Sequence, residues 1–346
     1  MALRRRRELD HEDIAGIALE HLDSRESWQR FINAFRSSVI PLADSADAQL
    51  DDESLASLWS TMIVFLSHTA LSSELRKERL FREAQAMGLH VLPIHYSSPV
   101  PDTRALTDRV GERELDARML RFDEDAGLEL LRRLEPFAAE LHDYTLENPQ
   151  FHRLDAALYY ALVRSFEPRR VLEVGSGFST TVASLAAQRN GGTRITCIDP
   201  RPRADIAGLP CLDEHVALEV QEVGPERFDG LGAGDFLFVD SSHTSRIDSD
   251  VNVIVLEVLP RLASGVVVHV HDVFLPWEYP RPWVVDQQHF WNEQYLLAAF
   301  LSANADWEVL FAGHFMARRQ PAAVNRVLAG DEESRAAGSS LWLRRR

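Results

Sequence analysis

Short, uninterrupted apolar segments alternate with helical segments in the second half of the sequence, and this alternation restricts the possible folds most strongly. It predicts strands at 170–174, 194–198, 216–223, 235–239, 266–270 and 307–312, with 339–343 as a candidate seventh. Helices are predicted at 179–188, 247–259 and 288–301. Strands that are apolar along their whole length belong to parallel sheets covered by helices on both faces. We therefore expect an α/β fold that binds its ligands at the carboxyl ends of the strands.

The first part of the chain has a different pattern. Apolar residues recur at helical spacing in 14–22, 55–63 and 128–134, with no sign of alternating strands. We expect a mostly helical N-terminal domain over residues 1–146 and an α/β domain over residues 147–346. By its position before the sheet, the helical domain is suited to serve as a lid over the substrate or as a homodimer surface.

Charge and cysteine content exclude several classes of protein. The formal net charge is −16, which argues against a general nucleic-acid binder and against binding to an anionic membrane surface. No apolar stretch approaches the roughly 20 residues that span a bilayer. The two cysteines, Cys197 and Cys211, form no CxxC pair, which is typical of a reducing, cytoplasmic compartment.

A glycine-containing loop follows the first predicted strand. Gly175 and Gly177 permit a tight turn and a close backbone approach to a ligand, and the next helix directs its N-terminal N–H groups into the same space. Asp199 ends the following strand, where a carboxylate can accept both ribose hydroxyls of an adenosine. The residues that we expect to bind such a cofactor are Glu173, Gly175, Ser176, Gly177, Thr180, Asp199 and Asp240.

The residues of the loop favour one nucleotide over another. A dinucleotide fingerprint requires a third glycine where this sequence has Thr180, and the bulky Phe178 lies inside the loop. Glu173, two residues before the first glycine, suits a ligand with a positive amino group better than one with a pyrophosphate. The loop therefore favours S-adenosylmethionine over NAD.

Three segments resemble a known family. They are 171–177 (VLEVGSG), 238–243 (FVDSSH) and 259–272 (LPRLASGVVVHVHD). Together they resemble class I S-adenosylmethionine-dependent methyltransferases, specifically the bacterial subgroup near macrocin-type O-methyltransferases and cephalosporin-hydroxylase-like proteins. The subgroup's DGxHxYxxxxxD pattern is matched incompletely, with Ser241 for the glycine, Ser245 for the tyrosine and Asp250 one residue early. The resemblance implies a Rossmann-like seven-stranded sheet with an antiparallel last strand.

Four residues at predicted strand ends are candidates for catalysis: Asp240, His243, His271 and Asp272. Methyl transfer to a hydroxyl requires positioning of the acceptor and removal of its proton. The resemblance implies that carboxylates after the fourth and fifth strands hold Mg²⁺. Asp240 and Asp272 match two of these positions, but His271 replaces the usual acid, so the set suits Mn²⁺, Fe²⁺ or Zn²⁺ better. The metal-free alternative is His271 or His243 as a general base.

The acceptor is predicted only by class. Trp277, Tyr279 and Trp283, in a proline-broken loop beside the candidate site, either stack on a sugar or ring substrate or pack in the interior. Asp155, before the first strand, is expected to be structural. The leading hypothesis is S-adenosylmethionine-dependent O-methylation of a small-molecule or glycan hydroxyl. The alternatives are an NAD-dependent oxidoreductase and a catalytically idle scaffold with the same fold.

Overall fold

The computed structural model describes residues 81–82, 84–86, 88, 90, 96–107, 110–143, 150–151, 153–327 and 338–346. The chain divides into two compact units, Met1–Asp102 and Thr103–Arg346. The second unit begins before residue 147 because helix α6 (Glu124–Ala138) packs against α7 (Arg153–Phe166) and against strand β6 (Trp307–Ala312). The helices predicted around 14–22 and 55–63 lie outside the described residues.

Seven strands and many short helices lie in the part of the second unit that the structure describes. The strands are β1 (Arg170–Val174), β2 (Arg194–Ile198), β3 (Leu212–Val216), β4 (Phe236–Val239), β5 (Val267–Val270), β6 and β7 (Leu341–Arg345). The other α-helices are α5 (Ala117–Leu120), α8 (Phe178–Asn190), α9 (Val220–Val223), α10 (Asp250–Asn252), α11 (Arg281–Val285), α12 (Glu293–Leu301), α13 (Gly313–Arg319) and α14 (Pro321–Val327). Among the described helices, none combines the length and apolarity that crossing a membrane requires.

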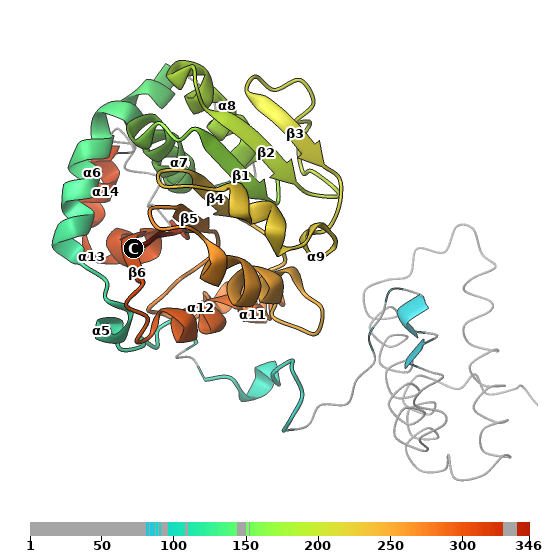
Figure 1. The fold of residues 1–346 in the computed structure, drawn as a ribbon. Coiled ribbons are helices and arrows are strands. Elements are labelled where there is room, and N and C mark those ends of the chain that lie inside the picture. Colours follow the sequence, from blue (N-terminus) through green and yellow to red (C-terminus); the bar gives the residue numbers. More distant parts are fainter. Residues whose placement is uncertain are drawn as a thin grey trace, which may run out of the picture. The chain divides into compact units, whose positions relative to one another are not determined.

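The strands form one mixed sheet in the order β3-β2-β1-β4-β5-β7-β6 (Figure 1). β1 to β5 pair in parallel, whereas β7 lies antiparallel to both β5 and β6. This arrangement confirms the predicted α/β class and the Rossmann-like sheet with an antiparallel last strand. The strand order reverses between β1 and β4, which in open α/β sheets is where ligands bind.

Helices pack on the sheet, and the side chains buried between them form the hydrophobic core. α7 packs against α6 and α8, and α12 packs against the π-helix η4 (Val253–Val258). In Figure 1, α6 and α13 lie at the β6 edge of the sheet, and both pack against β6. Tyr159 of α7 stacks on Phe238 of β4, with ring centroids 4.5 Å apart, and both rings are fully buried. The all-apolar β4 is therefore sealed between neighbouring strands and α7.

The third strand differs from its prediction. The segment 216–223 was expected to form it, but β3 is Leu212–Val216, and Val220–Val223 forms the short helix α9. β3 is an edge strand that pairs with β2, and its middle residues are exposed. An exposed edge does not need apolar side chains, so the sequence of β3 lacks the apolar run that identified the central strands. Val220 instead packs inward from a helical turn that ends at Gly224.

Two predicted helices also differ in their bounds. The segment 247–259 contains α10 followed by η4, and a 3-10 turn, η5 (Leu259–Arg261), continues it. Ser249 begins α10 by accepting the N–H of Asn252. The helix predicted at 288–301 begins only at Glu293. Residues 286–292 have no regular helix, and their aromatic side chains pack beside the candidate site.

Candidate functional site

The glycine loop connects β1 to α8 and packs directly on the end of β4. Gly175 has a φ of +82°, and a Cβ added there would lie 1.8 Å from the carbonyl oxygen of Asp240. Gly177 has a φ of +150° and begins α8, and its N–H is donated to the Thr180 hydroxyl at 2.9 Å. Both glycines are therefore required by the backbone, at the point where the strand order reverses.

Asp199 lies against this loop, as its position after β2 predicts. One carboxylate oxygen accepts the Ser176 N–H at 2.7 Å and the Ser176 hydroxyl at 3.0 Å. The other oxygen accepts the Arg201 N–H at 2.7 Å. The half-buried carboxylate thus joins the glycine loop to the segment after β2, at the sheet edge where we expect the cofactor's ribose.

Glu173 lies in the interior rather than on the surface of the loop. Its side chain is fully buried. It accepts a hydrogen bond from the Tyr159 hydroxyl at 2.8 Å, and the Cys197 thiol lies 3.6 Å away. Burial raises the pKa of this carboxyl to about 7, although hydrogen bonds from Thr180 and Tyr159 oppose that rise. The Glu173 side chain therefore points into the interior, toward Tyr159. Its contact with a cofactor amino group stays a prediction.

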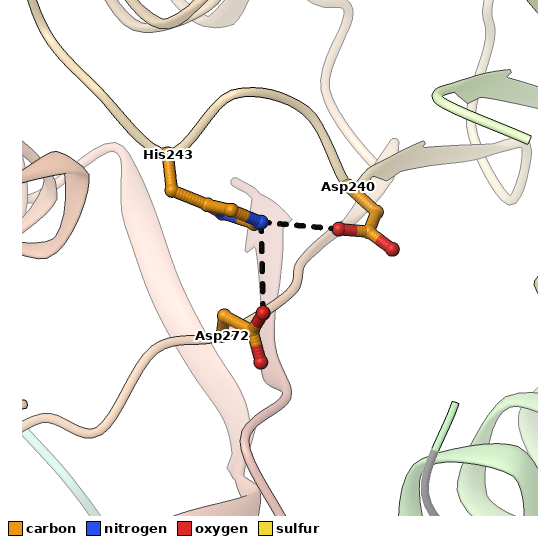
Figure 2. Close-up of side chains that lie close together, drawn as sticks. All are labelled: Asp240, His243 and Asp272. Atoms are coloured by element: carbon orange, nitrogen blue, oxygen red, sulfur yellow. Dashed lines mark ion pairs between the residues drawn. The ribbon is translucent and has the colours of Figure 1, made fainter. Parts of the chain in front are cut away.

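Asp240, His243 and Asp272 converge at the carboxyl ends of β4 and β5 (Figure 2). His243 Nε2 lies 3.2 Å from an oxygen of Asp240 and 3.6 Å from an oxygen of Asp272. His243 and Asp272 both have a φ near +55°, which is uncommon for residues other than glycine. Three of the four predicted catalytic residues therefore form one cluster, held by a locally strained backbone.

Glu293 and Trp291 hold the other side of the His243 ring. The buried Glu293 carboxylate lies 3.0 Å from His243 Nδ1, and the Trp291 ring lies 4.4 Å from the imidazole. The N–H groups of Asn292 and Glu293 are both donated to the carbonyl oxygen of His243. With Nδ1 facing Glu293, the second ring nitrogen, Nε2, is directed at Asp240 and Asp272.

Opposite charges dominate the titration of this cluster. Burial would lower the pKa of His243, but hydrogen bonds to Asp240 and Glu293 raise it well above its usual range. Burial would likewise raise the pKa of Asp240, but the charges of His271 and His243 hold it below its usual range. The carboxylates of the cluster therefore stabilise a positive charge, carried either by a protonated His243 or by a metal ion bound where that proton would be.

His271 lies on the far side of Asp272. It is buried, its Nε2 is 3.7 Å from Asp272 Oδ1, and its ring lies 5.2 Å from that of Phe151. Among the described residues, Asp240, His243 and Asp272 have potential ligand atoms that all lie within 4.8 Å of one another, and His271 is not in this group. The metal set of Asp240, His271 and Asp272 stays a prediction, whereas the three side chains that lie closest together are Asp240, His243 and Asp272. His271 follows β5 and its ring lies 5.4 Å from that of His269, so it borders the cluster through Asp272.

Asp272 is oriented by a residue at the start of β7. The Ser339 hydroxyl lies 2.9 Å from Asp272 Oδ1, and the backbone of Ser339 is held by the buried carboxylate of Asp155. Sequence reasoning missed Ser339 and assigned no site function to Asp155. No local signal identifies this contact, because 67 residues separate Ser339 from Asp272.

The aromatic loop after β5 is largely interior. Trp277 and Tyr279 are 5% and 2% exposed, and the Arg318 guanidinium lies 4.4 Å from the Trp277 ring centroid. These two residues therefore pack in the fold and do not form an open stacking surface. Trp283 is half-buried and meets Trp291 edge-on at 5.4 Å. Trp283 and Tyr279 both meet the ring of Trp291, which packs on His243, and of these two Trp283 is the more exposed.

The donor set fits a divalent metal ion. Two carboxylate oxygens and one imidazole nitrogen are close enough to share an ion, and the second nitrogen of that imidazole is held by a buried carboxylate. Metal-binding histidines usually have such a carboxylate partner. Mg²⁺ prefers oxygen ligands, so this mixed set suits Mn²⁺, Fe²⁺ or Zn²⁺ better.

Residues 172–273 match the sequence profile of a family described as a methyltransferase domain. The match extends from β1 past the end of β5 and so includes both the glycine loop and the Asp240–His243–Asp272 cluster. An uncharacterised protein from Archaeoglobus fulgidus is 29% identical over 167 residues, which cover 41% of this chain and 73% of the relative. A solved O-methyltransferase from Bacillus cereus, in complex with SAH, is 16% identical with a TM-score of 0.35, covering 66% of this chain and 94% of its own.

Proposed function

We propose that this protein transfers a methyl group from S-adenosylmethionine to a hydroxyl of a small molecule or glycan. The observation that carries the proposal is the contact between Gly175 and Asp240, which joins the cofactor loop to the proton-accepting cluster at one sheet edge. A methyl donor and an acceptor hydroxyl must meet in line, so their sites must adjoin. The similarity of residues 172–273 to a methyltransferase domain supports the same reaction class.

In this proposal the glycine loop and Asp199 bind the donor. The N–H groups at the start of α8 and the Asp199 carboxylate face the sheet edge where adenosine would lie. Because the sulfonium methyl is already activated, the protein needs chiefly to orient the acceptor and to accept its proton.

His243 in its neutral form is the group that would accept that proton, and because its pKa is raised, this form prevails only at pH values above that raised pKa. Glu293 fixes its Nδ1, which leaves Nε2 directed at the acceptor side of the cluster. Asp240 and Asp272 would stabilise the imidazolium that forms. A divalent ion held by Asp240, His243 and Asp272 would instead lower the pKa of an acceptor hydroxyl bound to it.

Isothermal calorimetry with S-adenosylhomocysteine tests the donor assignment. We expect binding to the full chain that is lost in Asp199→Asn and retained in Asp213→Asn, which changes an exposed aspartate on β3. No binding to the wild-type protein would rule out the proposal. Fluorescence titration with NADH provides the second arm, because binding of NADH in its place would favour the oxidoreductase alternative.

Titration with Mn²⁺, followed by electron paramagnetic resonance, distinguishes the two forms of the chemistry. Binding that disappears in His243→Ala would assign the cluster to a metal. If Mn²⁺ does not bind, His243 remains the proton acceptor of the proposal, and an acceptor screen with labelled S-adenosylmethionine is then run without metal.

A further inference from the structure

Two buried polar side chains lie one turn apart on the same face of α7. Asp155 and Tyr159 are both fully buried, and their spacing of four residues places them side by side on the helix. Neither is itself among the residues expected to bind the donor or the acceptor. Each nevertheless begins a series of hydrogen bonds that leads to a different part of that site.

The hydrogen bonds from Tyr159 lead to the glycine loop. Its hydroxyl is donated to Glu173 at 2.8 Å. The Cys197 thiol lies 3.6 Å from Glu173 and 4.0 Å from the Thr180 hydroxyl, and Thr180 lowers the pKa of Glu173. Thr180 in turn accepts the N–H of Gly177 at 2.9 Å. Tyr159, Glu173 and Thr180 are all fully buried, so a missing partner cannot be replaced by water without cost.

The hydrogen bonds from Asp155 lead to Asp272. The Asp155 carboxylate accepts the N–H groups of Ser339 and Ser340 at 3.1 Å each. The Ser339 hydroxyl is donated to Asp272 Oδ1 at 2.9 Å. Ser339 also accepts the N–H of Val273 at 2.7 Å through its carbonyl oxygen, which fixes it beside β5.

We propose that α7 positions both halves of the site, with Tyr159 setting the glycine loop through Glu173 and Thr180, and Asp155 setting Asp272 through Ser339. Tyr159 and Asp155 are positioning residues in this scheme, because they act through other side chains. The inference rests on the proposed function for its binding readout, and its second readout is independent of any ligand.

Tyr160→Phe is a matched control for Tyr159→Phe. Both substitutions remove one hydroxyl from a fully buried tyrosine of α7, but the Tyr160 hydroxyl is donated to Glu140, away from the loop. Two readouts are compared in the full chain: the affinity for S-adenosylhomocysteine by calorimetry, and the amide exchange rate of Gly177 without ligand. We expect Tyr159→Phe to weaken binding about tenfold and to speed exchange, and Tyr160→Phe to change neither.

Asp155→Asn has its own matched control in Asp235→Asn. Asp235 is equally buried and also binds backbone N–H groups, those of Arg170 and Gly232 at the other end of β4. We expect Asp155→Asn to shift the ring resonances of His243, which faces Asp272, while S-adenosylhomocysteine binds within about threefold of wild type. Asp235→Asn should leave those resonances in place.

The outcomes separate this inference from the proposed function. Equal behaviour of Tyr159→Phe and Tyr160→Phe in both readouts overturns the Tyr159 half, and equal behaviour of the two aspartate variants overturns the other half. If the wild-type protein does not bind S-adenosylhomocysteine, the proposed function fails. The Tyr159 half of this inference is then decided by the Gly177 exchange rate alone. If Tyr159→Phe does not fold, Thr180→Val replaces it: faster Gly177 exchange than in wild type supports the Tyr159 half, and an unchanged rate overturns it.

Discussion

At the scale of single residues, Glu293 and Glu173 are both buried but have opposite relations to the site. Glu293 touches His243 directly, whereas Glu173 lies beneath the glycine loop with neutral donors around it. Both side chains are buried, so the ionised carboxylate is favoured only where a positively charged group lies beside it. Substitution by glutamine preserves the shape of either side chain and removes the charge.

Glu293→Gln should lower the pKa of His243. The Glu293 carboxylate lies 3.0 Å from Nδ1 and is one of the groups that raise the pKa of this imidazole. Loss of its charge should therefore lower the pKa by about 1 to 3 pH units, measured by NMR titration of the ring protons. Glu278→Gln, which changes a carboxylate bound to Tyr295, is the control. An unchanged pKa would mean that Asp240 and Asp272 alone determine the charge of His243.

Glu173→Gln should change how stability depends on pH. Burial raises the pKa of Glu173 to about 7, above its value in an unfolded chain, and the ionisable groups near it are Tyr159, Cys197 and Asp240. A raised pKa contributes stability that is present below about pH 4 and lost as the pH rises through 7. The free energy of unfolding of the variant, relative to wild type, should therefore rise by about 3 kcal/mol between pH 4.5 and 8.

Urea unfolding followed by tryptophan fluorescence measures this difference. Glu257→Gln, an exposed glutamate of η4, is the control and should give a difference that does not depend on pH. A constant difference for Glu173→Gln would show that Glu173 has the same charge in the folded and unfolded protein.

At the scale of elements, the junction of β1, β4 and α8 sets the position of the site. Gly175→Ala should be much more destabilising than Gly191→Ala. Both glycines have a φ near +80°, so each alanine pays about 1 kcal/mol for that backbone conformation. At Gly191, the C-cap of α8, nothing lies within 4 Å of the added Cβ, whereas at Gly175 it meets the Asp240 carbonyl.

The clash should cost Gly175→Ala about 1 to 3 kcal/mol beyond Gly191→Ala, and it should also abolish S-adenosylhomocysteine binding. Chemical unfolding of both variants provides the first value, and calorimetry provides the second. Equal stabilities would mean that β4 moves away from β1 without cost.

The same elements show how much of the molecule is predictable from sequence. β1, β2, β4 and β5 are mostly buried, so their apolar runs identify them, and Gly175, Asp199, Asp240 and Asp272 come at or just after their ends. β3 was misplaced because an edge strand has no such run. Glu293 is 50 residues from its partner His243, and Ser339 is 67 residues from its partner Asp272. No local sequence pattern predicts these contacts, because they depend on how distant elements pack.

At the scale of the whole molecule, every residue of the proposed donor site belongs to the unit Thr103–Arg346. We therefore expect donor binding to depend on residues of this second unit. A ligand that binds the folded state stabilises what it touches and the elements joined to it, which slows amide exchange there. This provides a test of where the donor binds and of whether the first unit serves as a lid.

Hydrogen exchange of the full chain, with and without saturating S-adenosylhomocysteine, should show protection in peptides that cover 173–181, 198–204 and 238–243. These segments form the glycine loop, the Asp199 turn and the end of β4, which hydrogen bonds and the Gly175 contact join into one surface. Protection should be absent in Asp199→Asn, because that variant loses the ribose acceptor. Peptides from residues 1–102 should exchange at the same rate in both states. Slower exchange there would mean that the first unit closes over the donor, and the site would then have to be redrawn to include it.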